Sequence, residues 1–213
     1  KKKILAFTIM TVAALSLFGC KKKEEPATTE VATTQEATTE ETTTENLHEG
    51  EFYNELTGVW SKDYKPHRPI AIMINNIIDA VPSSSTKQAD IIYEFMVEGG
   101  ITRLMPIFSE YEDIEKLGSV RSARHYYMTV ANEHNAIYFC YGQSKPAEKR
   151  LKEGLIDAVN GLTYDAGYYR DNSRVAPHNV YTTGEKIVNA IADFGYSTEY
   201  SKDHEKVFSF NEE

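Results

Sequence analysis

The feature that most constrains the fold is a break in composition near the start of the chain. Residues 24–49 are rich in Thr and Glu and nearly free of apolar side chains, with loose repeats such as Ala27-Thr28-Thr29-Glu30. Such a segment buries too little apolar area to offset the entropy lost on ordering its backbone. We therefore expect a disordered tether at residues 20–46 and a single folded domain at residues 47–213, long enough for its own core.

A second feature precedes the tether. Lys1, Lys2 and Lys3 stand before an apolar stretch, residues 4–18, which leads into Gly19-Cys20. A basic start, a short apolar core and a small residue before a cut predict a signal peptide at residues 1–19. The alternative is a transmembrane anchor with an incidental cysteine, but the stretch is shorter than the roughly 20 residues that a spanning helix needs.

The run from Leu17 to Cys20 resembles a bacterial lipobox. This resemblance implies cleavage before Cys20 and a lipid on its sulfur. The mature chain is then expected to be lipid-anchored at the extracytoplasmic face of the cell membrane. With Cys20 lipidated, Cys140 is left without a disulfide partner, and we interpret it as a buried strand cysteine rather than a reactive thiol.

Charge and motif content exclude several functions. The chain carries 23 Lys+Arg against 32 Asp+Glu, a net charge of −9, which argues against nonspecific binding to nucleic acid. Zinc-spaced cysteine pairs, a P-loop, a dinucleotide fingerprint and a nucleophile elbow are absent from the sequence. We therefore expect no metal, no cofactor and no nucleic-acid partner.

The apolar pattern of residues 47–213 predicts a layered α/β or α+β sandwich. Short apolar runs indicate buried strands, and longer segments with helical spacing indicate helices. We expect Ser122 to be the N-cap of one helix, and Gly154 and Gly195 to end the other two. Gly99-Gly100 predicts a hairpin, so a mixed sheet with flanking helices is expected. The predicted strands are 68–75, 90–97, 101–108, 117–120, 136–141 and 207–210, and the predicted helices are 122–134, 146–153 and 183–194.

The first polar stretch that suggests a site surrounds the predicted hairpin. Alternation along a strand places Glu94 and Glu98 on one face, with Arg103 across the turn. Two carboxylates and a guanidinium in this arrangement could position a ligand or a metal. The alternative is an exposed sheet face with cross-strand ion pairs.

The second polar stretch is the strongest candidate site. Arg121, Ser122, Arg124 and His125 stand at the predicted start of a helix, where the dipole favours anions and disfavours cations. An anionic ligand explains cations at this position, because Arg forks bind carboxylate or phosphate. Salt bridges to nearby acidic side chains are the alternative.

The third polar stretch is a loop that Pro177 stiffens. It presents His178 and Asn179, and His178 is a candidate general base or ligand. A structural histidine that bonds backbone carbonyls is the alternative.

These stretches resemble the YerB-like bacterial lipoproteins, a family whose domain has no known function. The resemblance implies an envelope location, and it implies a second, C-terminal domain that can share the site. It is carried by five motifs in order: RPIAIMINN (68–76), QADIIYE (88–94), VEGGITR (97–103), VRSAR (120–124) and APHNVYT (176–182).

Two functional hypotheses follow. The first is a lipid-anchored envelope lipoprotein that binds an anionic small molecule or an envelope component, with Cys20 as the lipidation site. The second is a cell-envelope enzyme, such as a transferase that acts on phosphorylated lipid-linked glycans. A plain scaffold is a third interpretation. No residue is assigned a catalytic role from the sequence.

Overall fold

The computed structural model describes residues 47–211, which lie within one compact unit. Cys20, the predicted signal peptide and the predicted tether lie outside the described residues. Within the described part of the chain, no helix is both long and apolar enough to cross a bilayer.

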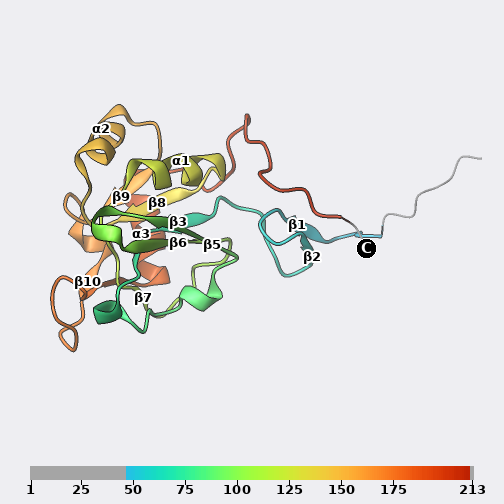
Figure 1. Cartoon of the computed structure of the whole chain (residues 1–213). Helices are drawn as coiled ribbons and strands as arrows, with labels where there is room; N and C mark the ends of the chain where they lie inside the picture. Colours follow the sequence, from blue (N-terminus) through green and yellow to red (C-terminus); the bar gives the residue numbers. More distant parts are fainter. Residues whose placement is uncertain (1–46, 212–213) are drawn as a thin grey trace, which may run out of the picture. The chain divides into compact units, whose positions relative to one another are not determined.

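A mixed six-stranded sheet forms the centre of the unit (Figure 1). Its order is β4-β6-β3-β8-β9, and β5 also pairs with β6. β3, β8 and β9 are parallel, whereas β6 runs antiparallel to β3, β4 and β5. The strand bounds are β3 Ile70–Ile72, β4 Ile74–Asn75, β5 Ile91–Met96, β6 Thr102–Phe108, β8 Ile137–Cys140 and β9 Ala158–Asn160.

The apolar runs of the central strands are buried on both faces of the sheet. Ile70 and Ile72 pack into one core with α3 (Gly184–Phe194), whereas Ala71 and Met73 pack into a second core with α1 (His125–Glu133) and α2 (Lys145–Glu153). A strand covered on both faces is expected to be continuously apolar rather than alternating. The three-layer arrangement confirms the predicted sandwich with a mixed sheet.

Two of the three helices begin and end as their sequences predict. The Ser144 hydroxyl accepts from the Ala147 amide at 3.4 Å and caps α2, and Gly154 ends that helix in the left-handed conformation. Thr183 caps α3 by accepting from the Lys186 amide at 3.2 Å, and Gly195 ends it.

The predicted N-cap of α1 is wrong. The helix begins at His125, with Arg124 in the cap position and no side-chain cap hydrogen bond. The Ser122 hydroxyl instead donates to the Tyr141 carbonyl at 3.2 Å. The backbone before the helix is held by neighbouring strands, since the Arg121 amide donates to the Met73 carbonyl. Sheet pairing therefore moves the N-cap by two residues, from Ser122 to Arg124.

Smaller elements complete the fold. β7 (Leu117–Gly118), β11 (Val180–Thr182) and β10 (Tyr169–Arg170) form a three-stranded sheet, and β1 (Phe52–Asn54) pairs with β2 (Val59–Ser61). A Cβ at Gly118 would lie 2.6 Å from the Tyr181 ring, so this contact needs glycine. The short 3-10 helices are η1 Ile78–Ala80, η2 Thr86–Gln88, η3 Glu98–Gly100 and η4 Asp165–Gly167.

The strand predicted at residues 207–210 is wrong. This segment is irregular, and its aromatic side chains pack individually: Phe208 lies against His134, with ring centroids 5.6 Å apart, and Phe210 lies against Gly58. The apolar residues that suggested a strand are used for these contacts.

Candidate functional site

Arg103, Arg121 and Arg124 form a cluster, hereafter the arginine cluster, beyond the carboxyl ends of the parallel strands. The Arg121 amide donates to the Met73 carbonyl at 2.9 Å, directly after β3, and the Arg121 carbonyl accepts from the Tyr141 amide at 3.0 Å, directly after β8. In open α/β sheets, ligands bind at the carboxyl ends of the strands. The second polar stretch therefore lies where this architecture usually places a site.

Arg103 is the most buried member of the cluster. It stands on β6 opposite Asn75 and Phe95, and it is only 5% exposed. Its Nη1 donates to the Ser122 carbonyl, whereas its buried Nε has no hydrogen-bond partner. Burial, with Arg124 and Arg121 nearby, lowers the pKa of Arg103 to about 10, so the side chain stays charged at neutral pH.

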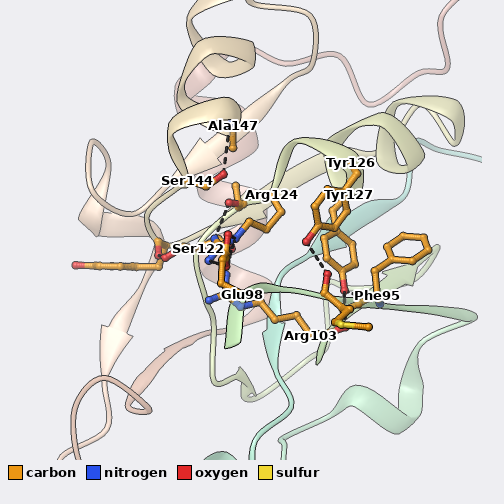
Figure 2. A network of polar contacts seen from close by, with 12 residues as sticks. Phe95, Glu98, Arg103, Ser122, Arg124, Tyr126, Tyr127, Ser144 and Ala147 are labelled. Carbon is orange, nitrogen blue, oxygen red and sulfur yellow. Dashed lines mark hydrogen bonds and ion pairs between the residues drawn. The ribbon is translucent and has the colours of Figure 1, made fainter. Parts of the chain in front are cut away.

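Arg124 is held between a carboxylate and the backbone. Its Nε donates to the two carboxylate oxygens of Glu98 at 2.8 and 2.9 Å, and its Nη2 donates to Oε2 at 2.6 Å (Figure 2). Its Nη1 donates to the Ala123 carbonyl at 2.9 Å. The hydrogen bonds from Arg124 hold the pKa of Glu98 below its usual range. Charge-assisted fork contacts of this kind are the strongest that a guanidinium makes.

Arg121 contacts the third polar stretch through a hydrogen bond to Pro177. Its Nη1 donates to the Pro177 carbonyl at 3.1 Å, and its Nε is buried without a partner. Burial and the neighbouring Arg124 lower the pKa of Arg121. The next residue, His178, accepts a hydrogen bond at Nδ1 from Asn75 at 2.7 Å. Residues far apart in sequence thus meet at one edge of the sheet.

Asn179 belongs to a neighbouring contact set. Its Oδ1 accepts from Arg170 at 2.9 Å, and the Arg170 guanidinium lies 5.4 Å from the centroid of the Tyr141 ring. Next to His178, an open hollow of about 470 Å³ is lined by Asp79, Ser173, Arg174, Val175, Ala176 and His178.

Glu94 lies on the opposite face of the sheet from the arginine cluster, so the predicted shared face of Glu94 and Glu98 is wrong. Glu94 is opposite Leu104, while Phe95 is opposite Arg103, and neighbouring strand residues point to opposite faces. Glu94 accepts instead from Asn76 at 2.9 Å and from Thr102 at 2.5 Å. Glu98 reaches the other face because it lies past β5, in η3.

Ser122 and His125 play lesser parts. Ser122 contributes its backbone carbonyl, which accepts from Arg103 and, at 3.2 Å, from Arg124. His125 is the first residue of α1, and its ring lies edge-on to Tyr126 with the centroids 5.2 Å apart.

Sequence reasoning missed Asn75, which holds His178, and Tyr138. The Tyr138 hydroxyl is fully buried near the Arg124 backbone and Arg103, and burial raises the pKa of Tyr138. Asn75 carried a usable signal, because a polar residue directly after a buried apolar run marks the end of a strand. Tyr138 carried none, because its sequence context is that of any core strand.

The electrostatic balance of the cluster favours an anion. Three guanidinium groups face one carboxylate, which leaves a local charge of 3 − 1 = +2 in a chain whose net charge is −9. Like charges brought together at a partly desolvated site repel each other, and an anionic ligand relieves that repulsion. Among residues 47–211, no group of three or more His, Cys, Asp or Glu side chains is arranged to hold a metal ion.

The fold and the cluster define a small α/β domain with a cationic edge, and comparison with known proteins places it in a family. Residues 56–197 match the family described as "Protein of unknown function (DUF3048) N-terminal domain", and the chain belongs to it. All five motifs lie within the matched residues, so the predicted resemblance to YerB-like proteins is confirmed.

A relative from Bacillus subtilis (strain 168) bears the name "Putative lipoprotein YerB". It is 39% identical over 130 residues, which cover 61% of this chain and 39% of the relative. The crystal structure of the YerB protein from Bacillus subtilis matches with a TM-score of 0.66 and 35% identity, over 70% of this chain and 52% of that one. The chain therefore spans about two fifths of the relative's length and about half of the crystallised chain.

Proposed function

We propose that this protein is a lipid-anchored lipoprotein of the bacterial cell envelope whose folded unit binds a polyvalent anion at the arginine cluster. The observation that carries the proposal is Arg103, a 95% buried arginine with an unpartnered Nε beside two further arginines. A buried donor without a partner is costly, and an oxyanion is the group that a guanidinium binds best.

The lipoprotein part of the proposal rests on two observations. The run from Leu17 to Cys20 resembles a lipobox, and the relative from Bacillus subtilis carries a lipoprotein name. A lipid on Cys20 at the start of the tether would keep the domain near the membrane. Its ligand would then be a soluble anion or an anionic component of the envelope.

The transferase alternative has less support from the contacts of the candidate residues. The Ser122 hydroxyl donates to a backbone carbonyl rather than to a histidine, and His178 Nδ1 is occupied by Asn75. A nucleophile and its base are expected within hydrogen-bond reach of each other. These two residues are engaged in structural contacts instead.

Titration of the full chain with sodium pyrophosphate, at constant ionic strength, tests the anion site. We expect Arg121→Gln to weaken binding about tenfold, because it removes one full charge and one fork from the cluster. Lys149→Gln is the matched control, since Lys149 is 82% exposed on α2 and loses the same charge. Equal weakening by both variants would show that only net charge matters, and would refute a localised site.

A further inference from the structure

Glu98 contacts the arginine cluster through its carboxylate, and no other acidic side chain among residues 47–211 forms an ion pair with the three arginines. Its side chain is 68% exposed, whereas the side chain of its partner Arg124 is 12% exposed. The Glu98 carboxylate accepts three hydrogen bonds from the Arg124 guanidinium. The carboxylate is thus presented from solvent to a fork that is largely buried.

The backbone around Glu98 can move so that the Glu98 carboxylate leaves Arg124. Gly99 and Gly100 follow it with φ of +76° and +72°, and a Cβ on either would have no atom within 4 Å. Glycines in open surroundings can change their backbone angles without steric cost. The turn can therefore move the carboxylate away without disturbing the paired strands β5 and β6.

The Arg124 fork would stay in place after such a withdrawal. Its Nη1 donates to the Ala123 carbonyl at 2.9 Å and the Ser122 carbonyl at 3.2 Å. These two bonds from Nη1 to backbone carbonyls fix the guanidinium. Nε and Nη2 would therefore keep pointing to the position that the Glu98 carboxylate now occupies. The carboxylate that occupies them has the charge and the bidentate geometry of an oxyanion ligand.

We propose that Glu98 is a built-in surrogate ligand, which an incoming oxyanion displaces from Arg124. This inference rests on the proposed anion site and specifies its regulation and ligand class. With Glu98 in place the cluster carries +2, and with Glu98 withdrawn it carries +3. The vacated fork therefore selects a polyvalent phosphoryl or carboxyl group strong enough to compete with an internal carboxylate, and it discriminates against monovalent anions.

Glu98→Gln in the full chain tests the displacement, with calorimetric titration of sodium pyrophosphate and, separately, of malonate at constant ionic strength. We expect a gain in affinity of roughly three- to tenfold, because the competing ion pair is lost. A larger gain in affinity for pyrophosphate than for malonate would identify a phosphoryl ligand. A larger gain in affinity for malonate would identify a carboxyl ligand.

Glu94→Gln is the matched control. It removes the same charge from the same hairpin, but Glu94 faces the other side of the sheet and contacts Asn76 and Thr102. We expect less than a twofold change. In an Arg124→Gln background, Glu98→Gln should add no affinity, because the fork it unmasks is gone. Glu98→Ala should reproduce the gain.

The outcomes separate this inference from the anion site itself. Affinity of Glu98→Gln no greater than that of the unsubstituted chain, with Arg121→Gln still weakened, would overturn the displacement and leave the site standing. No binding of either anion by the unsubstituted chain or by Glu98→Gln would overturn both. Binding by Glu98→Gln alone would support the displacement in its strongest form.

Discussion

Burial controls the chemistry of individual titratable residues in this domain. The clearest case outside the arginine cluster is His134, which is 1% exposed and whose Nε2 shares a hydrogen bond of 2.8 Å with the Tyr93 hydroxyl. Burial, together with the nearby His204, lowers the pKa of His134 to about 4. The neutral imidazole is therefore part of the folded structure.

This shift predicts an acid sensitivity. Between pH 6.5 and pH 4 the unfolded chain takes up a proton at His134 that the folded chain does not, so the free energy of unfolding falls as the pH falls. The contribution is up to roughly 3 kcal/mol. Chemical denaturation across this range should show a smaller loss of stability in His134→Gln, whose amide offers both a donor and an acceptor to Tyr93, than in the unsubstituted chain.

His125→Gln is the control, because His125 is only partly buried at the start of α1. It should follow the unsubstituted chain. A His134→Gln profile that parallels the unsubstituted chain through pH 4–6.5 would contradict the assignment.

Most strands and helices of the domain could be predicted from local sequence. The apolar run at 68–75 is buried throughout, although it is divided into β3 and β4, and Gly154 and Gly195 end α2 and α3 as predicted. The strands that were missed, such as β9 and β11, have three residues each and too short a pattern to detect. α1 was misplaced because its preceding residues pair with the sheet.

The cap of α3 gives a prediction at this scale. Thr183→Ala removes the acceptor for the Lys186 amide and should lower the free energy of unfolding by about 1 kcal/mol. Thr183→Ser keeps the hydroxyl and should retain most of that stability. The measurement is urea denaturation of the two variants beside the unsubstituted chain, and equal stability of the Ala and Ser variants would count against the cap.

The whole molecule combines a folded unit with the N-terminal segment that carries Cys20. If Cys20 is the anchor, Cys20→Ala should lower the membrane-bound fraction in bacterial cells about tenfold or more and abolish acyl labelling, because the anchor chain is lost. Cys140→Ala is the matched control, since Cys140 is fully buried on β8. It should keep both the membrane fraction and the label.

The outcome that would contradict the anchor is also specific. Retention of Cys20→Ala in the membrane fraction, with acyl label unchanged, would show that lipidation at this residue does not tether the protein.

The sequence by itself determined the sandwich class, most of the central strands, the family motifs and the two arginines of the VRSAR motif, because these depend on local pattern. Only the tertiary structure decided that Arg103 joins Arg121 and Arg124, and that Glu98 faces them while Glu94 does not. The physical reason is that strand register and the residue's place before or after a turn select the face of the sheet. The bond between Arg121 and the Pro177 carbonyl joins residues 56 positions apart, a contact that no local pattern encodes.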